Sequence, residues 1–275
     1  MRADLHLHST YSDGLYSPDE VCRLAKERGV ELLSITDHDT MAGYETKVAA
    51  AEKYRLKYVC GWEISAYADL ERVHVLGYGC NRGASYEAFL SARKEASLAR
   101  AEESVRKFRA IGIPISMEDV DRQRKDLTAP IHTMHISRAA SLYLGISPRD
   151  VHKQYLDVGK PANSNLGRPS PKEAIECIHS LEGVAVLAHP GRIAMPHAAK
   201  MEMIEGLVSC GLDGIETYYT SHTNEETEFF LGFAKKRGLL VTGGSDTHIE
   251  DAHTTIGAPV FFADEELLKR VKIIG

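Results

Sequence analysis

The chain has 275 residues and a mass of 30.4 kDa, which is enough for two small domains or for one large α/β barrel. Hydrophobic residues make up 43% and charged residues 26% of the sequence, a composition that excludes a disordered or fibrous protein. The formal net charge of -6 argues against a broad electrostatic surface for long duplex nucleic acid. A small phosphorylated substrate remains compatible with this charge.

The sequence shows no sign of membrane insertion or export. No apolar run approaches the ~18 residues of a spanning helix, and the first residues lead directly into strand-like sequence without a signal peptide. The five cysteines are far apart and form no CxxC pair, which argues against a disulfide framework or a zinc ribbon. We therefore expect a cytoplasmic protein without an obligate protein partner, whose cysteines are small core residues: Cys22, Cys60, Cys80, Cys177 and Cys210.

The first eighty residues alternate short apolar runs with segments of helical periodicity. This pattern is typical of β/α units around a parallel sheet or barrel. Ser17-Pro18-Asp19-Glu20 supplies an N-cap, a proline in the first turn and early acidic residues, so a helix is expected to begin there. In chain order we expect a strand over 3–9, a helix ending near 29, a strand over 31–38, a helix through 48 and 51, and strands over 58–65 and 73–79.

A different pattern begins near Ala84. A long charged helical stretch reaches Ile111, where Gly112-Ile113-Pro114 ends it. Shorter helices are expected over 117–124, 136–143 and 148–156, before a loop over 159–171 that is rich in Gly, Pro, Asn and Ser. We interpret residues 83–165 as a helical insertion that caps a barrel formed by residues 1–82 and 166–275.

The alternating pattern resumes after the insertion. The expected elements are a helix over 171–181, a strand over 184–189, a helix over 201–210, a strand over 214–219, a helix over 225–237 and a strand over 239–245. Barrel enzymes place their active sites at the C-terminal ends of the strands. Functional side chains are therefore expected at the ends of these strands or just after them.

Histidines and carboxylates gather at these predicted strand ends. His6 and His8 are two residues apart in a strand, so their side chains project from the same face. Imidazole suits zinc, iron or manganese, and a carboxylate can bridge two metals. Any one of these residues taken alone could be an ordinary polar residue at the start of a loop. Taken together, they predict a site that binds a cluster of metal ions. The nine candidate ligands are His6, His8, Asp13, His38, Glu63, His74, His189, Asp246 and His248.

Six short motifs surround these residues: His6-x-His8-Ser9, Ile35-Thr36-Asp37-His38-Asp39-Thr40, Gly61-x-Glu63, His74-x-x-Gly77-Tyr78, His189-Pro190-Gly191 and Gly244-Ser245-Asp246-x-His248. With them the chain resembles the PHP (polymerase and histidinol phosphatase) domain family, particularly stand-alone phosphoesterases of the trpH/YciV type. The resemblance covers essentially the whole chain. It implies a distorted (β/α)7 barrel with a helical insertion, and a cofactor of two to three divalent metal ions (manganese, iron or zinc).

The resemblance also implies how the ligands are shared. One metal would be held by His6, His8, Glu63 and Asp246, a second by Glu63 as a bridge with His74 and His189, and a third by Asp13, His38 and His248. All nine positions are intact. This favours an active enzyme over the metal-binding structural modules that this domain forms in some polymerases.

The predicted reaction is hydrolysis of a phosphate ester. A hydroxide that bridges two metals would attack phosphorus directly, without a phosphoenzyme, so Glu63 and Asp246 are expected to take part in catalysis as well as in metal binding. His222 follows a predicted strand, where it would contact substrate, act as general acid or cap the next helix. Arg138 and Arg192 are placed to bind phosphate in a bidentate manner.

The insertion offers a further candidate for substrate binding and several alternatives for the function. His135 precedes Arg138 in a His-x-x-Arg element like that of similar proteins, and it is expected to contact substrate. The resemblance favours a small nucleotide-type substrate, either a nucleoside 3′,5′-bisphosphate or the 5′ end of a short RNA. A cyclic sugar phosphate and histidinol phosphate are the alternative substrates. A non-catalytic metal-binding module is the alternative to an enzyme.

Metal-dependent amidohydrolases are a rival class, because they also begin with His-x-His on the first strand of a barrel. They usually bridge their metals with a modified lysine, whereas Glu63 has the bridging position here. Asp37 and Asp39 are expected to form hydrogen bonds beside His38. The remaining histidines lie outside any motif and are expected at the surface: His132, His152, His179, His197 and His253.

Overall fold

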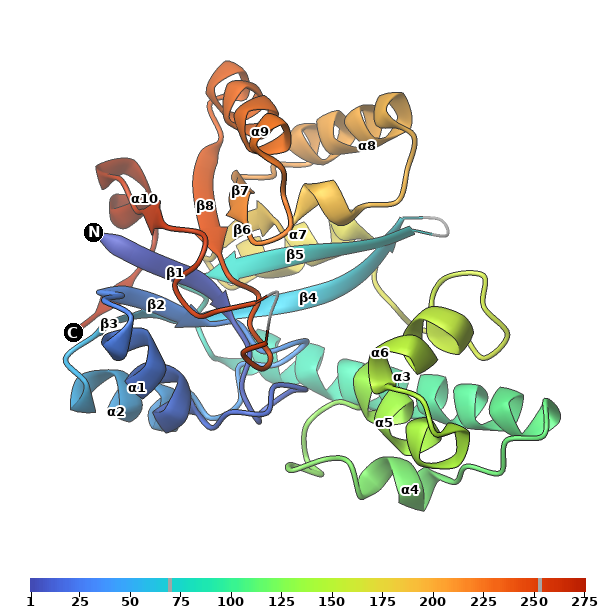
Figure 1. Cartoon of the computed structure of the whole chain (residues 1–275). Coiled ribbons are helices and arrows are strands. Elements are labelled where there is room, and N and C mark those ends of the chain that lie inside the picture. Colours follow the sequence, from blue (N-terminus) through green and yellow to red (C-terminus); the bar gives the residue numbers. More distant parts are fainter. Residues whose placement is uncertain (69–70, 252–253) are drawn as a thin grey trace.

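A computed structural model of the chain describes residues 1–68, 71–251 and 254–275. The chain is a mixed α/β protein whose described strands form two five-stranded sheets (Figure 1). The first sheet has the order β10-β3-β2-β1-β9, with β1 (Arg2–Leu7), β2 (Leu32–Ile35), β3 (Lys57–Val59), β9 (Phe261–Phe262) and β10 (Ile273–Ile274). The second has the order β4-β5-β6-β7-β8, with β4 (Gly61–Ala68), β5 (Glu71–Tyr78), β6 (Val184–Leu187), β7 (Gly214–Tyr219) and β8 (Leu240–Gly244).

The two sheets meet through isolated bridges rather than continuous ladders. Leu7 after β1 bridges Thr247 after β8, and His38 after β2 bridges Glu63 in β4. The backbone N–H of Asp246 also donates to the carbonyl of His6 at 2.8 Å. The described strands thus confirm an α/β fold, while closure into a (β/α)7 barrel stays a prediction.

The strand predicted over 58–65 is two strands that belong to different sheets. Cys60 separates β3 from β4, and β4 then pairs antiparallel with β5. β5 is also antiparallel to β6. β4 and β5 follow each other without a helix, as the strands predicted over 58–65 and 73–79 do, so they lack the connection that a parallel pair needs.

The helices of the main body pack against the sheets. They are α1 (Pro18–Glu27), α2 (Tyr44–Lys53), α7 (Pro171–Ser180), a short 3₁₀ turn (Pro190–Arg192), α8 (His197–Ser209), α9 (Asn224–Arg237) and α10 (Glu265–Arg270). The predicted start of α1 is confirmed, because Ser17 and Glu20 form a capping box and Pro18 opens the helix. α10, β9 and β10 lie in a region for which no element was predicted.

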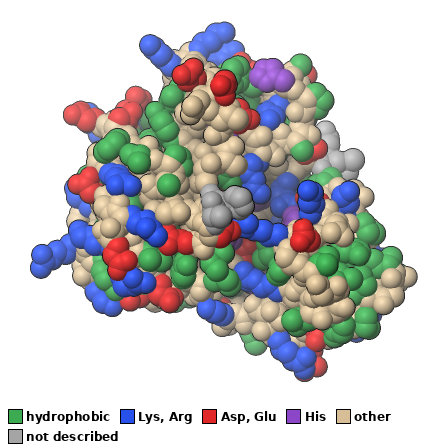
Figure 2. Space-filling model, in the orientation of Figure 1, with side chains coloured by type: hydrophobic (Ala, Val, Ile, Leu, Met, Phe, Trp, Pro, Cys, Tyr) green, Lys and Arg blue, Asp and Glu red, His purple; other side chains and the backbone are tan. Residues whose placement is uncertain are grey.

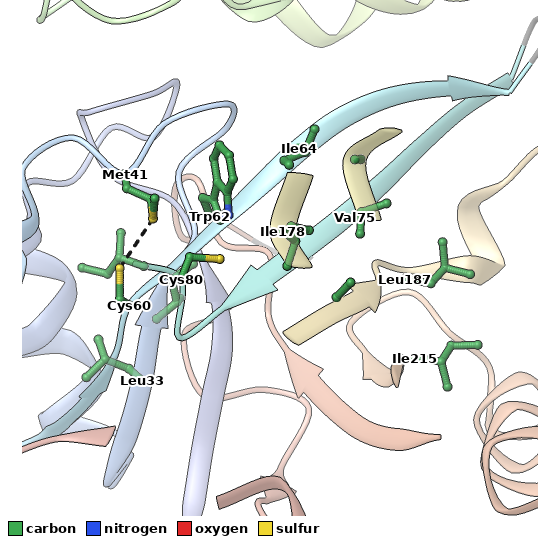
Figure 3. Packing of buried hydrophobic residues seen from close by; sticks show 14 of the residues in the cluster. Leu33, Met41, Cys60, Trp62, Ile64, Val75, Cys80, Ile178, Leu187 and Ile215 are labelled. Atoms are coloured by element: carbon green, nitrogen blue, oxygen red, sulfur yellow. Dashed lines mark hydrogen bonds between the residues drawn. The ribbon is translucent and has the colours of Figure 1, made fainter. Parts of the chain in front are cut away.

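A large apolar core fills the space between these helices and the strands. Trp62 of β4 is fully buried in it (Figure 3). Because side chains alternate along a strand, its neighbour Glu63 points to the opposite face. Cys60 and Cys80 lie in the same core, and all cysteines are free. The prediction that the cysteines are packing residues is confirmed for these two and for the buried Cys22.

Residues 84–156 form a helical segment beside the sheets (Figure 1). It contains α3 (Ala84–Ala110), α4 (Met117–Asp121), α5 (Thr133–Leu144), α6 (Pro148–Val151) and a π-helical turn (His152–Leu156). Its apolar side chains form a separate core around Phe108, Ile115 and Ala139. The helices predicted for the insertion are thus present, although its boundaries at 83 and 165 stay a prediction. Within the described residues, no helix has the length and apolar character needed to cross a bilayer.

Candidate metal centre

The nine predicted ligands converge where the two sheets meet. Most come from β1 or from loops that follow β1, β2, β6 and β8. The predicted strand-end position is wrong for Glu63 and His74, which are the third residue of β4 and the fourth of β5. In the antiparallel register Ser65 pairs with His74 and Glu63 with Leu76, so Glu63 and His74 are diagonal neighbours on one face.

Glu63 is the centre of the cluster and is fully buried. Oε2 lies 3.0 to 3.3 Å from ring nitrogens of His6, His8 and His38. Oε1 lies 2.7 Å from His74 Nδ1 and 3.1 Å from His189 Nε2. The two oxygens of one carboxylate therefore face different groups of histidines, which is the arrangement expected of a ligand shared by two metals.

The side chains predicted for the first metal form one compact group. His8 Nε2 lies 3.1 Å and His6 Nε2 3.4 Å from Asp246 Oδ1. With Glu63, these residues offer ligand atoms that all lie within 4.8 Å of one another. The predicted ligand set is thus brought together in space.

A second group forms around Asp13. Its Oδ1 lies 3.1 Å from His248 Nε2, and His8 and His38 complete a set within 4.8 Å. This is the set predicted for the third metal, with His8 added. A further group of His38, Glu63 and His74 overlaps the set predicted for the second metal. The assignment of residues to individual metals stays a prediction, because His8 and His38 each lie in two groups.

The polar atoms of this cluster fit a group of divalent metals. Several buried side-chain atoms have no hydrogen-bond partner among the described residues: His6 Nε2, His8 Nδ1 and Nε2, Asp13 Oδ1, His38 Nδ1, Glu63 Oε2 and His189 Nδ1. Leaving buried donors and acceptors unpaired is costly. Imidazole nitrogens and carboxylate oxygens together are the ligands that manganese, iron and zinc accept.

The electrostatics keep most of these residues in forms that bind metals. Burial lowers the pKa of His38 to about 4 and that of His189 to about 3, so both rings are neutral near pH 7. Burial opposes ionisation of Glu63, yet the surrounding histidines hold its pKa well below the usual range. Burial also opposes the charging of His8, but Asp246 and Glu63 outweigh it and raise the His8 pKa to about 10.

Two of the predicted ligands lie on unusual backbone. Asp246 has φ of 54° and His189 has φ of 28°, values that non-glycine residues rarely adopt. Such conformations persist only where the surrounding structure holds them, and they concentrate at functional sites. Close approach is also required at Gly244, where an added Cβ would lie 2.3 Å from the Cβ of His6. The backbone is therefore shaped to bring Asp246 against β1.

Two residues that the sequence analysis missed hold the ligands in place. Glu216 is fully buried, with Oε1 3.0 Å from His6 Nδ1 and Oε2 accepting from the backbone N–H of His189 at 2.8 Å. The Tyr219 hydroxyl donates to Asp246 Oδ2 at 2.9 Å. For Glu216, the available signal was an acidic residue in the middle of a predicted strand.

Of the predicted substrate residues, Arg192 lies at the cluster. Its Nη1 donates to Asp246 Oδ2 at 3.1 Å and to the Tyr219 hydroxyl at 3.0 Å, and its side chain is 53% exposed. The guanidinium is thus anchored by one nitrogen beside the predicted ligands. The exposed part of the Arg192 side chain faces solvent, from which a substrate would arrive.

His135 and Arg138 of α5 contact the loop that carries Asp13. His135 Nε2 lies 3.1 Å from the carbonyl of Ser12, and Arg138 Nη2 donates to the carbonyl of Asp13 at 2.7 Å. Burial lowers the pKa of His135 to about 4, so its ring is neutral. These contacts tie the helical segment to the candidate centre, and the predicted substrate contacts of both residues stay a prediction.

The environment of His222 favours a structural role. Its Nδ1 lies 2.9 Å from the carbonyl of Thr217, and its Nε2 accepts from the backbone N–H of Gly191 at 3.1 Å. Backbone groups occupy both ring nitrogens, so neither is free to transfer a proton in this arrangement. The alternative of a helix cap is wrong, because Thr223 is the residue that caps α9. The predicted role as general acid stays untested.

The surface location predicted for His132 is wrong. This residue is 6% exposed, its ring centroid lies 5.6 Å from that of His38, and its Nε2 has no hydrogen-bond partner among the described residues. The prediction is also wrong for His152, which is partly buried with its Nε2 3.2 Å from Arg72 Nη2. His179 and His197 are exposed as expected, and His253 lies outside the described residues.

The hydrogen-bonding roles predicted for Asp37 and Asp39 are confirmed. Asp37 accepts from the backbone and hydroxyl of Ser9 and forms a buried ion pair of 2.6 Å with Lys47. Asp39 accepts from the backbone N–H of Ser65 at 2.9 Å. The two carboxylates thereby attach the His38 loop to Ser9 on one side and to β4 on the other.

Comparisons with known proteins place this geometry in context. The model of the PHP domain matches residues 4–133. The chain is 31% identical to phosphoribosyl 1,2-cyclic phosphate 1,2-diphosphodiesterase of Eggerthella lenta, over 90% of this chain and 94% of the relative. It is 30% identical to 3′,5′-nucleoside bisphosphate phosphatase of Chromobacterium violaceum, over 89% and 86%. The solved structure of an amidohydrolase from Chromobacterium violaceum, with bound sulfate and no metal, has a TM-score of 0.87 at 28% identity and covers 99% of this chain and 98% of its own.

Proposed function

The chain belongs to the PHP domain family, and we propose that it is a metal-dependent phosphoesterase that hydrolyses a small nucleotide-type phosphate ester. The observation that carries this proposal is the convergence of histidines and carboxylates on Glu63, with buried ligand atoms that have no hydrogen-bond partner among the described residues. Both relatives described above are, by name, enzymes that act on phosphate esters. The reaction class is therefore hydrolysis of a phosphoric ester.

The residues that would hold the metals are those in the three groups around Glu63 and Asp13. We propose two to three manganese, iron or zinc ions. When bound, such ions polarise phosphoryl oxygens and make water a nucleophile near neutral pH. The distribution of ligands implied by the family is supported most directly for His6, His8 and Asp246, which form one group with Glu63.

The chain's own residues supply orientation and charge. Tyr219 and Arg192 both donate to Asp246 Oδ2, which leaves Oδ1 on the side of His6 and His8. The guanidinium nitrogens of Arg192 that have no partner among the described residues can then bind phosphoryl oxygens and stabilise the charge that develops on them. Asp246 is thus fixed as a ligand, and Arg192 as the cation beside it.

Three arginines, two on α3 and one in the loop before α7, support an anionic substrate. Arg100 Nη1 donates to the carbonyl of Leu166 at 2.9 Å, and Arg168 Nη2 to the hydroxyl of Thr133 at 3.3 Å. Arg93 donates to a backbone carbonyl as well. Among the described residues, none of these three guanidinium groups has a carboxylate within ion-pair distance.

Burial and mutual repulsion act on these arginines. Burial and repulsion from Arg168 and Arg93 lower the pKa of Arg100 to about 9. Attraction to Asp39 offsets this lowering only in part. Arg168 also lies close enough to the centre to act on the charge of His74. Lys and Arg side chains gather around a hollow between the main body and the helical segment (Figure 2). A second phosphate of the substrate would relieve this repulsion, which favours a bisphosphate.

Replacing Arg168 with alanine is expected to raise the KM for adenosine 3′,5′-bisphosphate by roughly 10- to 100-fold, because a charge-assisted hydrogen bond contributes about 1.5–3 kcal/mol. We expect a much smaller change in kcat, since Arg168 contacts no predicted metal ligand. Steady-state kinetics with saturating manganese measure both constants. Arg106→Ala is the control, because Arg106 is exposed on α3 and pairs only with Glu103 among the described residues. Equal KM values for both variants would contradict the proposed contact.

The substrate itself is tested by a panel assayed with added manganese. It comprises adenosine 3′,5′-bisphosphate, a short RNA with a 5′ phosphate, phosphoribosyl 1,2-cyclic phosphate and histidinol phosphate. We expect the highest kcat/KM for the bisphosphate. Preference for the cyclic phosphate would favour the alternative suggested by the Eggerthella lenta relative. Activity on histidinol phosphate alone would overturn the nucleotide assignment, and no activity with any metal would favour a metal-binding structural module.

Hydrolysis at carbon is less well supported. The carboxylate of Glu63 lies between the two histidine groups where an amidohydrolase usually has a modified lysine. Lys47, which is buried nearby, is paired with Asp37 instead. We further propose that the two sheets are parts of one distorted (β/α)7 barrel, a proposal supported by the bridges Leu7–Thr247 and His38–Glu63.

A further inference from the structure

β7 supplies none of the nine predicted metal ligands, yet its side chains contact three of them. Glu216 contacts His6 and His189, and Tyr219 contacts Asp246. The strand lies between β6 and β8, the strands that lead into His189 and Asp246. Two residues on β7 therefore reach predicted ligands from three different segments of the chain.

The two oxygens of Glu216 have separate partners. Oε1 lies 3.0 Å from His6 Nδ1, and Oε2 accepts from the backbone N–H of His189 at 2.8 Å. The other ring nitrogen of His6, Nε2, faces Glu63 and Asp246. A metal on Nε2 requires the proton of the neutral ring to be on Nδ1, and an acceptor at Nδ1 selects that tautomer and orients the ring.

The contact with His189 concerns the backbone rather than the ring. His189 has φ of 28°, a conformation that must be held by its surroundings. The hydrogen bond to Glu216 is made by the backbone N–H of this strained residue. Its ring, through Nε2, lies 3.1 Å from Glu63 Oε1, whereas the ring of His6 faces Glu63 Oε2. One buried carboxylate thus holds histidines that face the two different oxygens of Glu63.

We propose that Glu216 is a positioning residue that sets the affinity of the centre for metal by fixing the His6 tautomer and the His189 backbone together. This inference rests on the proposed metal-dependent function. Glutamine has nearly the same shape but only one acceptor oxygen, so it cannot accept from both the His6 ring and the His189 N–H. Glu216→Gln therefore separates the acceptor role from simple packing.

The test is manganese binding to metal-stripped full-length chain, measured by titration calorimetry with manganese chloride alone. We expect Glu216→Gln to weaken binding by roughly 10- to 100-fold, the scale of effect that outer partners of metal ligands have. The matched control is Glu228→Gln on the exposed side of α9, for which affinity should equal that of the wild type. Circular dichroism and thermal unfolding of the metal-free forms show whether each variant is folded.

A second variant of Glu216 and the phosphate ester assay distinguish failure of this inference from failure of the proposed function. Glu216→Asp retains both acceptor oxygens and is expected to bind manganese more tightly than the glutamine variant. Equal affinity of wild type and folded Glu216→Gln would overturn the inference while leaving the proposed function intact. Weak binding by the variant, in a chain that hydrolyses none of the phosphate esters, would support the inference and contradict the proposed function. A wild type that binds no manganese would overturn both, and failure of both variants to fold would assign Glu216 a purely structural role.

Discussion

Replacing Glu63 with glutamine is expected to lower kcat/KM for the phosphate ester at least about 10³-fold, the scale of loss that follows removal of one preorganised charge-stabilising group. Both oxygens of Glu63 are used, one toward His38 and the other toward His74. In glutamine one oxygen becomes an NH₂ group, which cannot bind a metal and would donate toward one group of histidines. The change should therefore affect more than one metal position, as seen in metal content by mass spectrometry alongside kinetics.

Glu52→Gln provides the matched control, because Glu52 is exposed on α2. It should keep wild-type activity and metal content. The Glu63 variant must be shown to be folded, since Glu63 is fully buried. A folded Glu63→Gln that retains a tenth or more of wild-type kcat/KM would exclude a central role for this carboxylate.

Removal of metal by a chelator is expected to abolish hydrolysis and to lower the thermal stability of the chain. Several buried ligand atoms of the cluster, among them His6 Nε2 and Glu63 Oε2, have no hydrogen-bond partner among the described residues, so the bound ions would stabilise the folded state specifically. A ligand at 100 times its Kd contributes about 2.7 kcal/mol per site. For a chain of this size that corresponds to a fall in Tm of roughly 5–10 °C.

Differential scanning calorimetry before and after chelation measures this fall, and added manganese should restore both Tm and activity. Magnesium is a useful comparison, because it prefers all-oxygen ligands and should restore less. Full activity in chelator, with metal content below one ion per ten chains, would rule out metal-dependent catalysis. An unchanged Tm with lost activity would instead indicate that the metals bind weakly.

Much of the candidate centre could be predicted because all the candidate ligands except Asp13 lie in short motifs in or near a strand. The two-residue spacing of His6 and His8 places both on one face, and the structure brings both to Asp246. Helix starts were equally local, as the capping box at Ser17 shows. Features whose cause lies within a few residues along the chain could be recognised from the sequence.

Other features depended on packing between distant segments. Glu216 and His6 are 210 positions apart, and nothing local marks their contact. His132 was expected at the surface because it lies outside any motif, but packing of α5 against the Asp13 loop buries it. Likewise, the division of one apolar run into β3 and β4 at Cys60 is decided by which neighbouring strands each half pairs with.

By itself, the sequence determined which residues are candidate metal ligands, where α1 begins, and that a helical segment lies in the middle of the chain. The tertiary structure decided the arrangement: two sheets joined at bridges, Glu63 between two groups of histidines, and Glu216 and Tyr219 behind the ligands. The physical reason is that residue types and local periodicity are written along the chain, whereas strand register and buried hydrogen bonds result from the free energy of packing the whole chain.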